Sequence, residues 1–252
     1  MIPKTIHYCW FGRNPLPRSA ERCIASWRKF FPDYEIKEWN EDNFDVNIIP
    51  YTRQAYEAKK YAFVSDYARF WILYHYGGLY FDTDVEVIKP FDDILAKGAF
   101  MGVEAGAVVR HDDEQTLAVA PGLGLGVNPG LGLYKELLDY YDDLNFVDGS
   151  GRQIGGTIVT HTTRVLHRYG LPNEVSEPVE VAGVWIYPSD YFCPMDSTTG
   201  ITVVTPRTVS IHHYDCSWMD HDTFSWRLHL LKNRINRLLG SRFANILNRI
   251  IH

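Results

Sequence analysis

Gly77 and Gly78 constrain the fold of this chain most strongly, because they separate a long helical pattern from an apolar strand. Residues 55–76 carry apolar side chains at helical spacing, and two consecutive glycines end such a pattern. Leu79-Tyr80-Phe81 then predicts a strand, which ends at Asp82-Thr83-Asp84. A helix that turns back through two glycines into a buried strand predicts a helix packed on a sheet.

The preceding elements extend this pattern to β-α-β-α-β over the first 85 residues. The strands are expected at 5–11, 34–39 and 79–81, and the helices at 20–30 and 55–76. This order is typical of an α/β fold with helices on the faces of a mixed, mainly parallel sheet. Further along, we expect helices at 132–141 and 157–169 and strands at 184–188 and 202–205. The chain shows no internal repeat or linker before residue 226, so residues 1–226 are predicted to form one domain.

The cysteines and the hydropathy pattern bear on location. Cys9, Cys23, Cys193 and Cys216 are scattered and form no CxxC pair, so neither a zinc site nor a disulfide framework is predicted. The N-terminus lacks a signal-peptide pattern, and no apolar run approaches the roughly 20 residues needed to span a bilayer. We therefore expect a cytoplasmic protein, or one peripheral to the inner face of the cell membrane.

Residues 227–252 form a basic segment that we treat as a second unit. The net charge of the chain is −6, but this segment holds six Lys and Arg and no acid, which leaves the first 226 residues at −12. Its apolar residues follow helical spacing, so we expect a basic amphipathic helical tail. Such a tail either binds an anionic membrane surface or packs on the acidic body, and both alternatives stay open. Binding of nucleic acid is not expected from an acidic body.

The motif Asp82-Thr83-Asp84 is the first candidate for chemistry. It follows an apolar strand, and ligand sites in α/β sheets cluster at the carboxyl ends of strands. Two carboxylates together with substrate phosphates are a typical ligand set for Mg²⁺ or Mn²⁺. A divalent ion placed there would neutralise a diphosphate leaving group. As a bare tripeptide, however, the motif fits a surface turn equally well.

Two other functions fit the same residues. Phe81-Asp82-Thr83-Asp84-Val85 also matches the D-x-D-x-[TV] motif of haloacid-dehalogenase-like phosphatases, in which Asp82 would be the nucleophile. Those proteins usually carry the motif on their first strand, whereas two strands precede it here. A sugar- or nucleotide-binding protein without turnover is the third hypothesis.

Asp66 and Arg69 lie in the preceding helical segment, three residues apart and so on one face. An exposed pair of this kind contributes little to stability. Apolar neighbours such as Phe63 and Leu73 instead predict a buried helix, in which an Asp and an Arg need each other or a ligand.

Three segments together resemble glycosyltransferase family 32. The first is Ser65-Asp66-Tyr67-Ala68-Arg69 followed by residues 73–85, which is similar to the DXD region of that family. The second is the opening run from Ile2 to Gly12, and the third is Ser210-Ile-His-His-Tyr-Asp-Cys-Ser-Trp218. The family includes yeast-type α-mannosyltransferases and bacterial capsular polysaccharide transferases, and the glucosylating domains of large clostridial toxins share its signature. The resemblance covers residues 1–90 and 184–218 and is looser between them.

The resemblance implies a GT-A fold, a nucleotide-sugar donor and retention of anomeric configuration. It implies that Asp82 and Asp84 hold a metal with the donor diphosphate, that Asp66 accepts hydrogen bonds from donor-sugar hydroxyls, and that Arg69 contacts the sugar or diphosphate. It also implies that Tyr8, Cys9 and Trp10 bind the nucleotide base and that Ser65, on the helix, binds the donor. At the diphosphate it implies His212 or His213 as a metal ligand, with Ser217 and Trp218 closing over the phosphates.

The function expected from these residues is a metal-dependent glycosyltransferase of surface polysaccharide synthesis. Its cofactor would be Mn²⁺ or Mg²⁺, and its donor a nucleotide-sugar, with a UDP-sugar favoured over GDP-mannose. The acceptor would be a glycan or a lipid-linked glycan. Trp10, His7 and His213 each also fit a structural role, and Glu104 either reaches the acceptor or lies in a loop.

Overall fold

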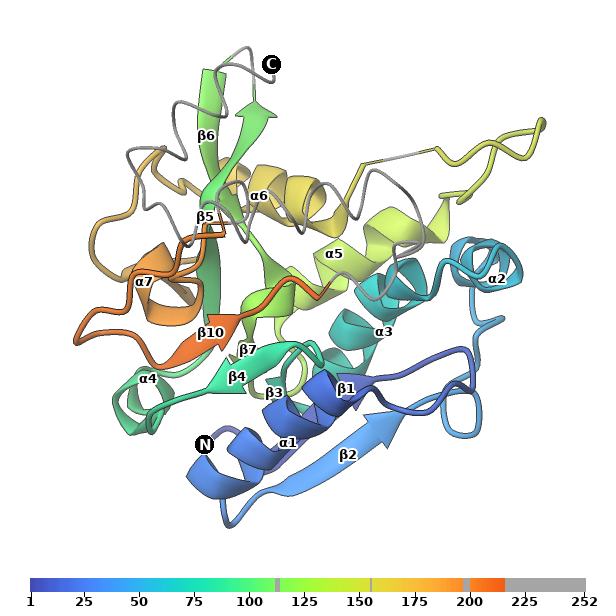
Figure 1. Cartoon of the computed structure of the whole chain (residues 1–252). Helices are drawn as coiled ribbons and strands as arrows, with labels where there is room; N and C mark the ends of the chain where they lie inside the picture. The colour runs from blue at the N-terminus through green and yellow to red at the C-terminus, as the bar shows by residue number, and fades with distance from the viewer. Residues whose placement is uncertain (112–113, 155, 197–199, 216–252) are drawn as a thin grey trace.

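The computed structural model describes residues 1–111, 114–154, 156–196 and 200–215 of the chain (Figure 1). The predicted tail at 227–252 and the predicted site residues Ser217 and Trp218 lie outside the described residues. The predictions made for them therefore stay predictions. No helix in the described part of the chain is long and apolar enough to cross a membrane.

A mixed sheet forms the centre of the described part, with the strand order β2-β1-β3-β7-β5-β9-β8 and with β6 paired to β5. Pairing is parallel between β1 and β2, β1 and β3, and β5 and β9, and antiparallel elsewhere. Strands β2, β1, β3, β5 and β9 therefore run in the same direction. The strands of this sheet are β1 (Thr5–Cys9), β2 (Glu35–Trp39), β3 (Gly78–Tyr80), β5 (Phe100–His111), β6 (Glu114–Val119), β7 (Leu125–Val127), β8 (Val179–Val181) and β9 (Val184–Tyr187).

Helices cover both faces of the sheet, and the buried side chains form two apolar clusters. One cluster includes side chains of α3 and α5, and the other includes side chains of α1 and α4. The helices are α1 (Arg18–Phe30), α2 (Pro50–Glu57), α3 (Tyr61–Tyr76), α4 (Asp92–Lys97), α5 (Gly132–Asp142), α6 (Ile158–Arg168) and α7 (Ser189–Phe192), with a 3-10 turn η1 (Pro121–Leu123). The predicted α/β class, with a mixed, mainly parallel sheet between helices, is confirmed.

Two of the predicted elements are wrong in detail. The helix predicted over residues 55–76 is two helices, because α2 ends at Glu57 and Lys59 takes a left-handed backbone with φ 56° before α3 begins. The strand predicted at 202–205 is absent from the described residues, where Thr202 makes only an isolated bridge to Met195. Val203 and Val204 are exposed, so these two apolar side chains do not pack in a sheet as the prediction required.

The His7 ring of β1 links β2 and the turn after α3 through two hydrogen bonds. Trp39 Nε1–H of β2 donates to His7 Nδ1 at 3.0 Å, so the proton of the neutral ring lies on Nε2, which donates to the Gly77 carbonyl at 3.0 Å. Gly77 ends α3 with φ 63°, and a side chain there would overlap Pro129. His7 therefore ties β1 and β2 to the glycine turn between α3 and β3, and its structural role is confirmed.

A second, two-stranded sheet brings the C-terminal part of the described chain to the middle of the molecule. Strand β10 (Ser210–His212) pairs antiparallel with β4 (Val85–Val87), so that His212 lies opposite Val85. On its other side β4 is held by α1, where Trp27 Nε1–H donates to the Val85 carbonyl at 2.8 Å and Ser26 accepts from the Val87 N–H at 2.9 Å.

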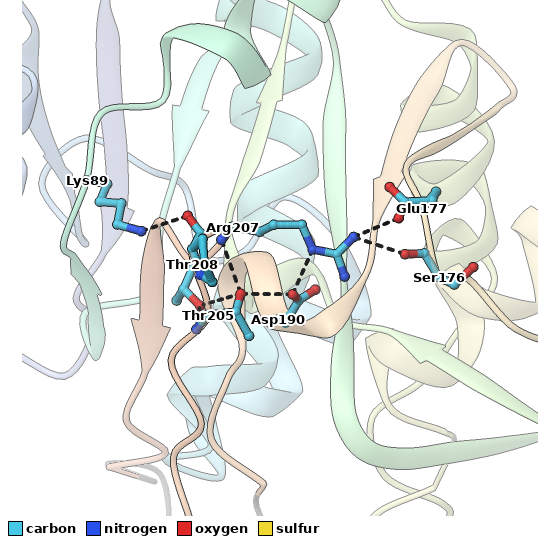
Figure 2. Close-up of polar contacts among 8 residues, drawn as sticks. Lys89, Ser176, Glu177, Asp190, Thr205, Arg207 and Thr208 are labelled. Atoms are coloured by element: carbon cyan, nitrogen blue, oxygen red, sulfur yellow. Dashed lines mark hydrogen bonds and ion pairs between the residues drawn. The ribbon is translucent and has the colours of Figure 1, made fainter.

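Arg207 fixes the segment that leads into β10 (Figure 2). Its Nε donates to Asp190 of α7 at 2.9 Å, and its Nη1 donates to Glu177 and to the Ser176 carbonyl. Lys89, just after β4, donates to the Pro206 carbonyl at 2.8 Å. Charged contacts on both sides of residues 205–208 thus hold the segment that precedes β10.

The buried His7 predicts a pH dependence of stability. Burial lowers the pKa of His7 to about 4, the nearby Lys37 lowers it further, and the Gly77 hydrogen bond opposes the shift. The unfolded chain takes up this proton near pH 6.5, so stability from the neutral ring is full above that pH and is lost as pH falls toward 4. The loss amounts to about 3 kcal/mol.

Urea unfolding of wild type and His7→Gln between pH 4 and 7.5 measures this contribution. We expect the variant to be less stable at pH 7.5 but to lose less stability on acidification than wild type. Parallel pH profiles for the two proteins would show that His7 does not carry the effect.

Candidate active site

Arg69 lies at the centre of a buried charge network below the carboxyl end of β3. Its side chain is only 5% exposed, and its Nη2 lies 3.0 Å from Asp66 Oδ1 and 3.3 Å from Asp82 Oδ1. Nη1 contacts Asp82 Oδ2 at 3.5 Å, and Nε donates to the Ser65 carbonyl at 3.2 Å. In the pair predicted from the helical spacing, Arg69 is therefore buried and Asp66 is mostly so, and the guanidinium is shared with the DXD motif.

Tyr80 and Gly122 complete the surroundings of Asp82. The Tyr80 hydroxyl donates to Asp82 Oδ1 at 3.1 Å, while the Arg69 guanidinium lies over the Tyr80 ring, 5.1 Å from its centroid. The Asp82 N–H donates to the Gly122 carbonyl at 3.3 Å. A Cβ at Gly122 would lie 2.2 Å from Asp82 Oδ2, so a glycine is required for this approach.

Two carboxylates share one guanidinium in this network, and the pKa values reflect that imbalance. Burial raises the pKa of Asp66 to about 6, against the attraction of Arg69 and with a further contribution from Asp82. Burial also raises the pKa of Asp82, again opposed by Arg69. With both carboxylates ionised the network carries a net charge of −1. Its free acceptor oxygens therefore favour hydroxyl donors or a cation.

Asp84 lies at the other end of the turn between β3 and β4 and contacts the last residue of β10 and a residue that follows that strand. Its Oδ1 is 3.2 Å from His212 Nε2, and its Oδ2 accepts the Asp215 N–H at 3.0 Å. Burial raises the pKa of Asp84, but the charge and hydrogen bond of His212 and the Asp215 N–H outweigh burial, so its pKa lies below the usual value. Asp84 is thus held ionised, and Asp82 and Asp84 differ in their environments.

Of the two adjacent histidines, His212 faces the carboxylates. His213 Nε2 lies 2.9 Å from Glu86 Oε2 on the more exposed side of the ladder, and only its backbone N–H reaches the Asp84 carbonyl, at 2.9 Å. The His212 side chain is partly buried, and its buried Nδ1 has no hydrogen-bond partner within the described residues. The placement favours His212 over His213 as a metal-site residue.

Tyr8 and Cys9 are the last residues of β1, the strand next to β3, and Trp10 follows them directly. Trp10 is partly exposed at the same sheet edge as Asp82, and its Nε1–H donates to the Asn14 carbonyl at 2.6 Å. Cys9 is buried beside Tyr80, and burial raises its pKa to about 12, so its thiol stays protonated. The Tyr8 hydroxyl donates to Glu38 at 2.6 Å. Only Trp10 of the three therefore offers an accessible side chain for stacking.

Glu104 is a further candidate that the sequence left undecided. It lies on β5, two residues beyond Gly102, the last residue paired with β9, and it accepts the Tyr214 hydroxyl at 3.1 Å. Burial raises the pKa of Glu104, while His212 and Tyr214 oppose the shift. The sequence analysis placed Glu104 either within reach of the acceptor or in a loop, and the loop alternative is wrong because Glu104 lies on β5. Its position becomes informative once β5 is known to run in the direction of β3.

No group of three or more His, Cys, Asp or Glu side chains in the described ranges is arranged closely enough to hold a metal ion. Both oxygens of Asp82 are already in contact with Arg69. Carboxylate oxygens are the donors that Mn²⁺ and Mg²⁺ prefer, so Asp82 and Asp84 suit the predicted ion in their chemistry, and the buried Nδ1 of His212, which has no described partner, is a further donor near them. In the described arrangement these side chains do not form a cluster that holds the ion, and the metal site stays a prediction.

Residues 17–101 match a family model described as the glycosyltransferase sugar-binding region containing the DXD motif. This range includes Asp66, Arg69, Asp82 and Asp84. The resemblance found in the sequence is therefore confirmed for the region that holds the buried charge network.

Similar proteins include inositol phosphoceramide mannosyltransferase 1 of Schizosaccharomyces pombe, which is 31% identical over 111 residues, or 40% of this chain and 33% of that protein. The uncharacterized glycosyltransferase L373 of Acanthamoeba polyphaga mimivirus is 32% identical over 40% of this chain and 42% of its own length. The chain thus matches about a third of the length of the first of these relatives and less than half of the second. Among solved structures, a glycosyltransferase involved in glycosylation of the major capsid of PBCV-1 has a TM-score of 0.46 at 10% identity, covering 86% of this chain and 95% of its own.

Gly122 provides a test of the network. Gly122→Ala places a Cβ against Asp82 Oδ2, and we expect a loss of about 1–3 kcal/mol in the free energy of unfolding together with displacement of Asp82 from Arg69. Gly132→Ala is the matched control, because a Cβ at Gly132 meets nothing within 4 Å. Thermal melts of both variants measure the difference, and equal melting temperatures would contradict the close approach.

Proposed function

We propose that this chain transfers a hexose from a nucleotide-sugar to a glycan or lipid-linked glycan acceptor, with a divalent metal ion as cofactor. The observation that carries the proposal is the buried Arg69 between Asp66 and Asp82, with Asp84 and His212 beside it. Asp82 and Asp84 lie in different environments although both belong to the turn between β3 and β4, and the family match covers both residues.

The buried network suits the donor sugar. Asp66 is fixed by Arg69 at 3.0 Å and lies on a helix that is rigidly packed between the sheet and α5. A carboxylate whose geometry is set in this way accepts hydrogen bonds from sugar hydroxyls without reorganising. Arg69 adds a buried positive charge, which stabilises both carboxylates and contributes to the field at the leaving phosphate.

Asp84, Asp82 and His212 are the residues that would hold the metal ion. When bound, the ion would supply charge neutralisation for the diphosphate that leaves the sugar. The oxygens of both aspartates already have partners, but those of Asp84 are His212, itself a proposed ligand, and the Asp215 N–H, whereas those of Asp82 are the Arg69 guanidinium and the Tyr80 hydroxyl. Asp84 is therefore the aspartate whose partners compete less with a metal ion. The contacts with Arg69 and Tyr80 also leave Asp82 poorly placed to act as a phosphatase nucleophile.

The donor base and sugar are the finer part of the proposal. Trp10 at the end of β1 offers a ring for stacking on the base, and this does not distinguish uridine from guanosine. The preference for a UDP-sugar rests on the sequence resemblance alone. The relatives named as mannosyltransferases favour a mannosyl donor instead, so both donors belong in the test.

The acceptor and the stereochemistry follow the same relatives. Inositol phosphoceramide, in the name of one relative, is a lipid, which supports a lipid-borne acceptor for this chain. Retention of configuration and a role in surface polysaccharide synthesis are part of the proposal, as is contact with the membrane through residues 227–252.

Donor turnover in the presence of Mn²⁺ tests this function. Thermal shifts with UDP-glucose, UDP-galactose and GDP-mannose identify the donor, because a bound ligand raises the melting temperature according to its affinity. Hydrolysis of that donor is then measured with and without Mn²⁺. We expect Asp84→Ala to lower the rate about 100-fold or more, because it removes the charge that holds the cofactor.

Asp139→Ala is the matched control, because Asp139 is exposed on α5 and its ion-pair partner among the described residues is Lys135. It should leave donor hydrolysis near the wild-type rate. Three results would overturn the proposal: no thermal shift with any donor, turnover of the donor that is independent of metal and of Asp84, or a phosphorylated Asp82 trapped during hydrolysis of a phosphate monoester.

A further inference from the structure

A cavity of about 390 Å³ lies between α5 and α6, apart from the charge network of Arg69. Glu136 and Tyr140 of α5 line one side, and Thr160, His161 and Arg164 of α6 line the other. In Figure 1 these helices lie together on one side of the sheet. The volume falls within the range of small-ligand pockets.

An aromatic surface forms part of the cavity. The rings of Tyr140 and His161 stack with their centroids 3.5 Å apart and an interplanar angle of 16°. Tyr140 still exposes 40% of its surface. Burial lowers the pKa of His161 to about 4, with Arg168 and Arg164 adding to the shift against Glu136, so the ring is neutral near pH 7. A stacked neutral pair of this kind offers a flat apolar face to the C–H face of a sugar ring.

The remaining wall is polar and of mixed charge. Glu136 is held by Arg168 and by the Tyr169 hydroxyl, which donates to its Oε2 at 2.7 Å. Arg164 forms no ion pair with any described residue, and His161 Nε2 is a buried nitrogen without a described partner. Arg168 also lines the cavity, so the wall offers both hydrogen-bond donors and acceptors, and sugar hydroxyls match such a wall.

A series of ring contacts connects the cavity with the charge network. Tyr141, next to Tyr140, lies 6.3 Å from the His161 ring and 5.7 Å from the Tyr67 ring, measured between centroids. Tyr67 follows Asp66 directly in α3. Asp66 is also close enough to Tyr141 to raise the pKa of that phenol. One layer of aromatic side chains therefore separates the cavity from Asp66.

We propose that this cavity is a carbohydrate-binding subsite that holds a neutral sugar unit of the acceptor glycan, with Tyr140 as its stacking surface and Glu136, Thr160 and Arg164 as its hydrogen-bonding groups. The role as an acceptor subsite rests on the proposed glycosyl transfer. In that reaction Asp66 would bind the donor sugar, and a sugar in the cavity would be separated from Asp66 by one layer of aromatic side chains. The binding of a sugar there is a separate physical claim, with its own test.

Saturation-transfer NMR on the full chain tests sugar binding without any donor or metal. The probes are methyl α-D-mannopyranoside, methyl β-D-galactopyranoside and methyl β-D-glucopyranoside at millimolar concentration. We expect at least one to bind, and Tyr140→Ala to weaken that binding about fivefold or more because it removes the stacking surface. Arg164→Gln, a second variant at an exposed position, should weaken it as well.

Tyr76→Ala is the matched control, because Tyr76 is also an exposed tyrosine at the end of a helix, and it should retain wild-type binding. Thermal melts establish that each variant is folded. The subsite is ruled out if none of the three glycosides binds, or if both cavity variants bind as wild type does. The NMR measurement contains no nucleotide-sugar, so it remains valid if the protein fails to hydrolyse any donor. A loss of sugar binding, in turn, would rule out the subsite without affecting the test of donor hydrolysis.

Discussion

The buried guanidinium of Arg69 is the interaction on which the candidate site depends. A charge that is 5% exposed is tolerated only because Asp66, Asp82 and the Ser65 carbonyl surround it. Those contacts in turn fix the start of the turn that carries Asp84. Removing the guanidinium would leave two partly buried carboxylates without a cation beside them. The geometry of the DXD motif therefore depends on the packing of α3, which carries Arg69.

The local elements were largely predictable because their signals are local. The glycine turn at Gly77 and the strand before Asp82 follow from residue type, and the burial of Asp66 and Arg69 follows from their apolar neighbours. The break between α2 and α3 was missed, since apolar spacing continues across Lys59 while the backbone does not. Valines at 203 and 204 have strand propensity but no strand beside them, and only the tertiary structure supplies that information.

The parts of the site that come from distant segments needed the structure. The choice between His212 and His213 depends on the register of β10 against β4, which residue type does not determine. Glu104 gains meaning only from the direction of β5 relative to β3. The cavity between α5 and α6 forms because these two helices pack together. Their amphipathic patterns do not specify each other as partners, so the stacking of Tyr140 on His161 could not be predicted.

The ladder between β4 and β10 has a consequence for how the protein is made. Its two strands are separated by more than a hundred residues, and the contact of Asp84 with His212 spans that whole interval. Non-local pairings of this kind form late, because the loop between them must first be closed. A growing chain would therefore complete the Arg69 network well before Asp84 meets its partners. We therefore expect the carboxylate pair to form in two steps during synthesis, so that a nascent chain stopped before residue 210 holds the first aspartate in place while the second lacks its histidine.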